Sequence, residues 1–315
     1  MPRSDPDVRT VLAPGDELAG HRVVRRIGRG SMGNVYEATR TDGTRVALKV
    51  LHPKLLTEDK ALHRFQREAR VGARIDSENV AKTLDAGVTD GRPWLAMELV
   101  EGETLDAFME RSAPLPAEVA ERLSRQLIAA VAAAHAAGVV HRDLKPDNVF
   151  VTRDAQLKIG DFGVAKSMDA ATFNSTRAGL GTPMWTAPEQ GREGWVPSPR
   201  ADVWALGLLV YYLYTGKLYW RHAQERSSLA ELSVELVRGD IAPASLRASE
   251  QGLAERLPSR FDRWFFRAVA RDPEQRFADA AEAGRAFGRL YRSRLPLYAL
   301  AVAGLIVVLV VLLLR

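Results

Sequence analysis

The chain contains no cysteine. This absence excludes disulfide bridges, zinc sites built from thiolates and a cysteine nucleophile, and it suits a reducing compartment. Neither sign of charge is in large excess, because 44 Lys and Arg residues against 39 Asp and Glu residues leave a net charge of only +5. The sequence shows no basic stripe interleaved with aromatic residues. We therefore expect no nucleic-acid partner.

The first twenty residues lack the features of a secretory signal. They are polar, contain three prolines, and have no charged start followed by an apolar core. We expect residues 1–20 to be a flexible N-terminal segment. In the whole chain of 315 residues, 46% hydrophobic and 26% charged residues are typical of a globular protein with one large or two ordinary domains.

A long hydrophobic run lies near the other end of the chain. Residues 295–314 contain no charged side chain, and about twenty apolar residues in a helix span the hydrocarbon layer of roughly 30 Å. A buried core helix is the alternative, but such a helix usually shows a polar face. Arg285, Arg289, Arg292 and Arg294 precede the run, and only Arg315 follows it. We expect a single-pass transmembrane helix in the cell membrane, with the preceding domain in the cytoplasm.

Between these segments, strand patterns come first and helical patterns follow. Alternation and turn residues predict strands over residues 21–27, 34–40, 45–50, 80–84 and 93–99. Helical periodicity predicts helices over residues 60–75, 116–138, 203–215, 227–238 and 261–270. The order indicates an α+β fold, with a small β-rich lobe at about residues 21–98 and a larger helical lobe at about residues 99–290.

A glycine-rich turn joins the first two predicted strands. It has the pattern GxGxxGxV and consists of Gly28, Arg29, Gly30, Ser31, Met32, Gly33, Asn34 and Val35. Dinucleotide-binding folds also use such glycines, but a helix follows them there. Between two strands, glycines let backbone amides approach phosphate groups that a side chain would block. The pattern therefore predicts a phosphate-covering loop.

Lys49 lies near the end of the third predicted strand and is flanked by aliphatic residues. A lysine in that position is partly buried and needs a partner. Glu68 on the following predicted helix is the candidate, since Glu58 comes too early in that helix. Such an ion pair would hold the ammonium group against the α- and β-phosphates of a nucleotide.

Two carboxylates, an amide and a lysine occupy two neighbouring loops further along the chain. The first loop reads His-Arg-Asp-Leu-Lys-Pro-Asp-Asn over residues 141–148, and Asp-Phe-Gly follows at residues 161–163. Phosphoryl transfer needs one acid to receive a hydroxyl proton, a second acid and an amide to hold magnesium, and a cation near the phosphate.

Together these motifs resemble those of the eukaryotic-type protein kinases, in the serine/threonine class found in bacteria. The resemblance covers about residues 21–290 and implies the two-lobed protein kinase fold. It also implies transfer of the γ-phosphoryl group of ATP to serine and threonine hydroxyls of proteins, with Mg²⁺ or Mn²⁺. By this resemblance Asp143 accepts the hydroxyl proton, Lys145 neutralises charge on the phosphoryl group, and Asn148 and Asp161 bind the metal.

The resemblance also implies an adenine site and a set of structural contacts. Around the adenine it places Ile27, Val35, Ala47 and Phe150, with Met97 behind the ring and the backbone of Glu98 and Val100 at its edge. These apolar side chains fit an ordinary core equally well. Further along, it implies that Thr182 bridges Asp143 and Lys145, Glu189 pairs with Arg276, and Asp202 holds the catalytic loop, against which His135 packs.

Regulation is expected at the segment between Asp161 and Glu189. A phosphate there would order the segment against Arg142 and Lys166. The candidate sites are Thr172, Ser175 and Thr176, of which Thr176 has the family's usual spacing from Thr182. Autophosphorylation implies a transient homodimer. The alternatives to an active kinase are a membrane-tethered pseudokinase scaffold and a small-molecule phosphotransferase.

Overall fold

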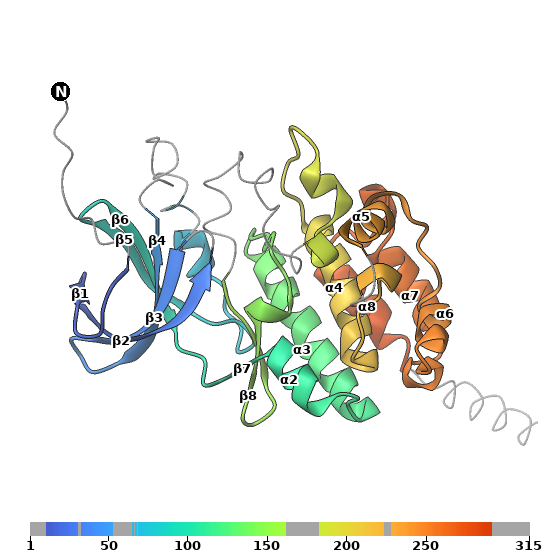
Figure 1. The fold of residues 1–315 in the computed structure, drawn as a ribbon, viewed down its shortest axis with the longest axis horizontal. Coiled ribbons are helices and arrows are strands. Elements are labelled where there is room, and N and C mark those ends of the chain that lie inside the picture. The colour runs from blue at the N-terminus through green and yellow to red at the C-terminus, as the bar shows by residue number, and fades with distance from the viewer. Residues whose placement is uncertain are drawn as a thin grey trace, which may run out of the picture.

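The protein is described by a computed structural model that covers residues 11–30, 33–52, 65, 67, 69–161, 183–223 and 228–291. A β-rich part and a helical part lie side by side, with a small sheet between them (Figure 1). The expected two-lobed α+β fold is therefore confirmed.

The first lobe is built on one antiparallel sheet with the order β1-β2-β3-β4-β6-β5. Its strands are β1 (Glu17–Leu18), β2 (His21–Gly30), β3 (Gly33–Arg40), β4 (Arg45–Leu51), β5 (Thr83–Thr89) and β6 (Arg92–Glu98). Because side chains alternate along a strand, the sheet buries a cluster on each face. One cluster contains Tyr36 and Leu48, and the other contains Ala47 and Met97 with Phe65 of the following helical stretch.

Part of the expected flexible N-terminal segment belongs to this lobe, which corrects the boundary at residue 20. Leu12 is 7% exposed, and its N–H donates to the Tyr36 hydroxyl oxygen at 3.0 Å. β1 pairs with β2. The segment is polar on average, but Leu12 and Leu18 are buried in the core of the sheet, and this fixes the backbone around them.

The strand expected at residues 80–84 was misplaced, since β5 begins only at Thr83. Val80 and Ala81 are buried for another reason. The Ala81 N–H donates to Ile159 O at 2.9 Å, and the Ile159 N–H donates to Asn79 O at 2.8 Å. Val80 and Ala81 are therefore buried where the first lobe contacts β9. The actual strand β5 contains Asp85 and Gly87 and lacks a strong apolar pattern.

A small sheet of order β7-β8-β9 lies between the large sheet and the helices. Its strands are β7 (Gly102–Thr104), β8 (Val149–Thr152) and β9 (Leu157–Ile159). The residues of the predicted catalytic loop, 141–148, run from the end of α3 (Ala117–Ala136) to β8. The second acidic motif follows β9 at once. The catalytic loop therefore ends at the small sheet from which the second loop starts.

The helical lobe is arranged around α4 (Pro199–Thr215), which is buried on nearly all sides. A helix that is apolar all round belongs in a core. The left-handed Gly216, with φ +67°, ends it. The other helices are α2 (Leu105–Ser112), α3, α5 (Leu229–Arg238), α6 (Ala244–Glu250), α7 (Phe261–Ala268) and α8 (Ala280–Gly288). The helices expected around residues 116–138, 203–215, 227–238 and 261–270 correspond to α3, α4, α5 and α7.

In the part of the chain that the structure describes, no helix has both the length and the apolar character to cross a membrane. The predicted transmembrane segment, residues 295–314, lies outside the described residues.

Candidate active site

Lys49 of β4 and Asp161 after β9 form an ion pair between the two parts of the fold. They are 112 residues apart in the sequence, and Lys49 is 9% exposed. Burial is the largest single effect and raises the pKa of Asp161, but the charge and hydrogen bond of Lys49, together with the nearby His141 and Lys145, lower the pKa overall. Asp161 is therefore a carboxylate at neutral pH.

A second set of contacts gathers around Asp143. The Asn148 Nδ2 donates to the Asp143 backbone oxygen at 2.8 Å and to its Oδ2 at 3.3 Å. The Lys145 Nζ lies 3.6 Å from the same Oδ2. The short 3-10 helix η2 (Pro146–Asn148) makes this geometry, because its tight turn brings Asn148 back towards Asp143.

His141 joins the two loops, a role that the sequence did not predict. It is completely buried. Its Nδ1 faces the Asp143 N–H at 3.3 Å, and its Nε2 lies 3.0 Å from Gly160 O. The tautomer with hydrogen on Nε2 satisfies both contacts. Since the Gly160 N–H also donates to Asn148 O at 2.9 Å, the residue before Asp161 is fixed on both sides.

Asp202 at the start of α4 holds the backbone of the loop, as expected. It accepts hydrogen bonds from the N–H groups of His141 at 2.7 Å and Arg142 at 2.9 Å. Its third partner is His135, whose Nε2 lies 2.9 Å away. The Nδ1 of His135 faces the Ala280 N–H at 3.1 Å. His135 thus links α8 to Asp202, the residue that holds the loop, which is a structural role.

The expected pair between Glu189 and Arg276 is also present. The Arg276 Nη1 and Nη2 lie 2.6 and 2.8 Å from the two Glu189 oxygens. The guanidinium is completely buried and also donates to the backbone oxygens of Ala270 and Arg200. This two-point pair anchors the 3-10 helix η7 (Pro188–Gly191) to the helical lobe.

The three glycines of the phosphate-covering loop differ in what the fold requires. A Cβ on Gly33 would lie 2.1 Å from Val50 O, so β4 itself excludes a side chain there. A Cβ on Gly28 or Gly30 would meet its nearest neighbour at 3.5 or 3.7 Å, which is ordinary contact. Among the described residues, no neighbour requires glycine at positions 28 and 30, which agrees with the expectation that a ligand approaches the backbone there.

The rest of the loop lies around this hairpin. Arg29 pairs with Asn34 across the turn, and Asn34 is buried. Ser31 and Met32, between the glycines, lie outside the described residues.

The expected adenine-site residues come from both sheets. Val35, Ala47 and Met97 pack in one apolar cluster, which fits either a core or a site. Ile27, next to the glycine loop, is 39% exposed, and this exposure favours contact with a ligand. Phe150 of β8 is partly buried against Gly160, where a Cβ would lie 3.0 Å from the ring.

Glu98, at the end of β6, is held by a contact that the sequence did not predict. Its Oε1 lies 2.7 Å from the Lys158 Nζ of β9. Its Oε2 accepts from the Lys82 N–H at 3.2 Å, and its own N–H donates to Lys82 O at 2.8 Å. Val100 follows in the segment that leads to the helical lobe. The expected adenine-edge backbone is therefore fixed to both lobes.

Several predicted residues lie outside the described part of the chain. They are Glu68, Lys166, Thr172, Ser175, Thr176 and Thr182. The described partner of Lys49 is Asp161, whereas Glu68 was the partner expected from the sequence.

The residues fit a divalent metal that is completed by phosphate oxygens. Because Asn148 uses its amide nitrogen on Asp143, its amide oxygen and the Asp161 carboxylate are the groups suited to a hard cation. Among the described residues, no cluster of three or more His, Asp or Glu side chains is placed to hold a metal. Mg²⁺ needs no such cluster, since it usually takes one or two carboxylates, waters and substrate phosphates.

Comparison with known families agrees with this geometry. The model of the protein kinase domain family matches residues 21–282. The chain belongs to the protein kinase family. Its kinase domain therefore contains both lobes described above, from β2 to the first part of α8.

Bacterial proteins are among its relatives. The chain is 38% identical over 288 residues to the serine/threonine-protein kinase Pkn1 of Myxococcus xanthus, covering 88% of this chain and 40% of that protein. It is 34% identical over 264 residues to PknL of Mycobacterium tuberculosis, covering 83% of this chain and 63% of that protein. The chain thus spans less than two thirds of the length of these relatives.

A solved structure shares the fold. The crystal structure of the Mycobacterium tuberculosis PknI kinase domain superposes with a TM-score of 0.66 at 30% identity. The match covers 89% of this chain and 99% of that one.

Proposed function

We propose that this chain transfers the γ-phosphoryl group of ATP to serine and threonine hydroxyls of proteins, in bacterial signalling. The ion pair between Lys49 and Asp161 is the observation on which the proposal depends. The two residues are 112 positions apart in the sequence, and the fold brings together the cation and the carboxylate expected to bind the nucleotide and its metal. Relatives named serine/threonine-protein kinases support the choice of acceptor.

The residues around Asp143 suit the transfer step. The Asp143 carboxylate orients the acceptor hydroxyl and receives its proton, while the Lys145 ammonium lies near enough to offset charge on the transferred group. Lys49 holds the nucleotide phosphates, and Asn148 and Asp161 would hold the metal. When bound, Mg²⁺ supplies neutralisation of the phosphate oxygens.

Two other functions remain distinct alternatives. A pseudokinase scaffold usually lacks the lysine or one of the acids, whereas Lys49, Asp143 and Asp161 are all present in contact networks. A small-molecule phosphotransferase can share a His-x-Asp loop of this kind. The Ala-Pro-Glu motif at residues 187–189, anchored by Arg276, favours a protein acceptor because this element docks protein chains in the kinase family.

The direct test compares Asp143→Asn with Asp147→Asn in the full chain. Asp147 is an exposed carboxylate in η2, four residues away, so it matches the chemical change. With labelled ATP, Mg²⁺ and a peptide array, Asp143→Asn should abolish transfer to serine and threonine peptides, and Asp147→Asn should retain it. An unmutated chain that labels no polypeptide would refute the proposed function.

A membrane location is part of the same proposal. The apolar run at residues 295–314 would anchor the chain in the cell membrane as a single span, with the kinase domain in the cytoplasm, because arginines cluster before it. Fractionation of cells expressing the full chain should place it in the membrane, and removal of residues 295–315 should release it.

We also propose control by phosphorylation between Asp161 and Glu189. Arg142 beside the catalytic aspartate would pair with a phosphate on Thr176, with Thr172 and Ser175 as the other candidates. The reaction would occur between two chains in a transient homodimer. Mass spectrometry of activated protein should find phosphate on Thr176, and activated protein with Thr176 unmodified would exclude that site.

A further inference from the structure

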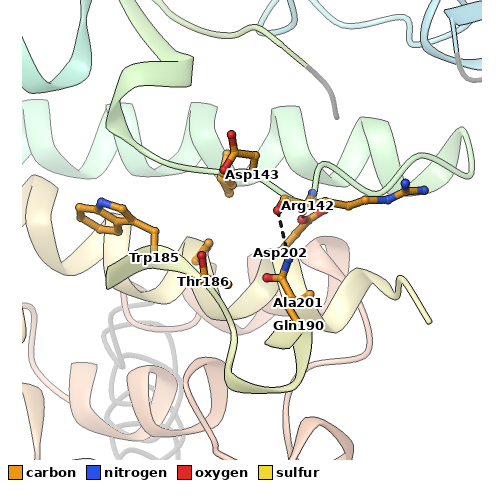
Figure 2. Close-up of a pocket in the computed structure, with 9 residues that line it drawn as sticks. Arg142, Asp143, Trp185, Thr186, Gln190, Ala201 and Asp202 are labelled. Atoms are coloured by element: carbon orange, nitrogen blue, oxygen red, sulfur yellow. Dashed lines mark hydrogen bonds between the residues drawn. The ribbon is translucent and has the colours of Figure 1, made fainter. Parts of the chain in front are cut away.

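Gln190 is a buried amide that connects η7 to the catalytic loop. It directly follows Glu189 and is 5% exposed. Its Oε1 accepts from the Ala187 N–H at 3.1 Å, and its Nε2 donates to Arg142 O at 3.1 Å. Figure 2 shows this second bond, which spans 48 residues of sequence.

The bond to Arg142 acts on the peptide unit that carries Asp143. The Arg142 carbonyl and the Asp143 N–H belong to one planar unit. Gln190 holds the carbonyl, and the His141 Nδ1 faces the N–H at 3.3 Å. Asp202 fixes the preceding N–H of Arg142 at 2.9 Å. The plane next to Asp143 is therefore held at both polar ends.

This support matters because the backbone at Arg142 is unfavourable by itself. Its φ is +67°, in the left-handed region that side chains other than glycine rarely adopt. Such a conformation persists only when surrounding contacts determine it. Side chains from two separate elements, Asp202 from α4 and Gln190 from η7, supply those contacts.

The same amide also holds the first residue of the Ala-Pro-Glu motif, Ala187. Trp185, Thr186 and Gln190 line one pocket together with Arg142 and Asp143 (Figure 2). Through the Ala187 N–H, Gln190 fixes the backbone next to Thr186. One side chain thus links the wall of this pocket to the residue that would receive the proton.

We infer that Gln190 is a positioning residue for phosphoryl transfer, coupling the segment around Ala187 to the orientation of Asp143. The inference rests on the proposed kinase function. Gln190 contributes no group to the reaction, and its effect passes through the peptide unit between Arg142 and Asp143. Its loss should therefore slow the transfer step and leave nucleotide binding unchanged.

A second glutamine provides a matched control. The Gln251 Oε1 accepts from the Tyr211 hydroxyl at 2.8 Å, and its Nε2 donates to Leu218 O at 2.9 Å. Like Gln190, it therefore makes one accepted and one donated bond, although both partners of Gln251 are distant in the sequence. Those partners belong to α4 and the turn that follows it. Loss of Gln251 reproduces the structural cost without touching the catalytic loop.

The experiment compares Gln190→Met and Gln251→Met in the full chain, with saturating ATP and Mg²⁺ and an acceptor peptide. Gln190→Met should slow single-turnover transfer by about ten- to a hundredfold, the size expected for a misplaced catalytic group. Gln251→Met should stay within about twofold. ADP affinity should be unchanged in both. Equal rates for the two variants, or a slowing matched by weaker ADP binding, would overturn the inference.

Gln190→Glu tests the hydrogen bond from Gln190 to the Arg142 carbonyl separately from the bond to Ala187. It remains informative even if Gln190→Met fails to fold. A carboxylate still accepts from Ala187 but opposes the Arg142 carbonyl, whereas a protonated carboxyl donates to it again. The charged residues lining the pocket are Arg142, Asp143 and Asp202. The transfer rate of Gln190→Glu, divided by that of the unmutated chain, should rise as the pH is lowered. A ratio independent of pH would contradict the role.

The two proposals fail in different ways. If the unmutated chain transfers no phosphate, the proposed function is wrong. If the unmutated chain is active and Gln190→Met matches its transfer rate, the kinase function stands and the role of Gln190 is wrong.

Discussion

Arg142 and Asp161 both have a positive φ, +67° and +54°. For residues other than glycine such a conformation costs on the order of 1–3 kcal/mol. Each is held by contacts from other elements, Arg142 by Asp202 and Gln190, and Asp161 by Lys49. The strained residues thus lie next to the proposed proton acceptor, Asp143, and at the proposed metal-binding carboxylate, Asp161, and we infer that the fold stabilises them because these groups must be oriented.

The glycine loop gives a prediction that separates folding from binding. Gly30→Ala adds a Cβ whose nearest neighbour lies 3.7 Å away, so the melting temperature should hardly change, whereas the KM for ATP should rise at least about tenfold as phosphate approach is blocked. Gly33→Ala forces a Cβ to within 2.1 Å of Val50 O and should lower the melting temperature. Thermal melts and ATP titrations check both. A Gly30→Ala chain with unchanged KM would disprove the role of this glycine.

Single residues were predictable from the sequence where a motif fixes their neighbours. The positions of Asp143, Asn148 and Asp161 follow from short ordered motifs, and their contacts agree with the expected site. The pair between Lys158 and Glu98 gave no signal, because two opposite charges 60 residues apart are common in any sequence. His141 was visible in the motif, but its contact with Gly160 depends on how two loops meet.

At the scale of elements, periodicity located the long, regular segments and missed the short ones. α3 and α4 have sustained apolar patterns, and both were predicted to within a few residues at their C-terminal ends. β7 and β9 have three residues each, too few for a period to show. β5 was misplaced because its pairing with β6, and not its own sequence, stabilises it.

The first lobe contains an acid-sensitive link across three strands. Glu37 of β3 is 5% exposed and contacts Arg25 of β2 and Arg45 of β4, each at 2.8 Å. The hydrogen bond from Arg45 lowers the pKa of Glu37 below its ordinary value of 4.5, despite burial. A lowered folded-state pKa means that the link stabilises the fold above pH 4.5 and that this stabilisation is lost as the pH falls through the lowered pKa.

Glu37→Gln should therefore lower the unfolding free energy at neutral pH, and the difference from the unmutated chain should shrink in acid. Urea unfolding at a series of pH values between neutral and acidic checks this. Asp42→Asn, in the exposed turn between β3 and β4, is a comparison for a carboxylate that pairs with no arginine among the described residues, since the hydrogen bond from the Thr44 N–H is the main cause that lowers its pKa. A difference that grows in acid would reverse the sign and refute the argument.

The pair between Glu189 and Arg276 should be among the costliest contacts to break in the helical lobe. Arg276→Met leaves a buried Glu189 carboxylate uncompensated, which typically costs about 3–5 kcal/mol. Glu274→Gln breaks the neighbouring pair between Glu274 and Arg200. Because the Glu274 side chain is 76% exposed, this change should cost about 0–1 kcal/mol of stability. Urea midpoints measure both. Similar losses of unfolding free energy in the two variants would show that the burial of an ion pair does not determine its contribution to stability.

At the scale of the whole molecule, several contacts between described residues join the lobes. Among them are the pair of Lys49 with Asp161, the pair of Glu98 with Lys158, and the bridge between Val80 and Ile159. The order of strands and helices predicted two lobes but not these contacts. The two residues of each ion pair are 60 and 112 positions apart in the sequence, and the third contact is a bridge outside the named strands. They form only when both lobes are folded, so local patterns contain no trace of them.

The proposed membrane anchor leads to a prediction about the whole chain. If residues 295–314 hold the protein in a bilayer, neighbouring chains meet at a raised effective concentration, and phosphorylation between them accelerates. The full chain in vesicles should autophosphorylate faster than a chain that ends before Leu295, when both are at the same low bulk concentration. Dilution should slow only the truncated chain, since its partners meet in solution.

The control for this comparison is concentration itself. At high concentration the truncated chain should reach the same final phosphorylation, which would show that its kinase domain is intact and that only encounter is limiting. Phosphate incorporation over time, measured across a dilution series, gives both rates. If the truncated chain activates as fast as the full chain at the lowest concentration, tethering does not drive activation, and the anchor must serve location alone.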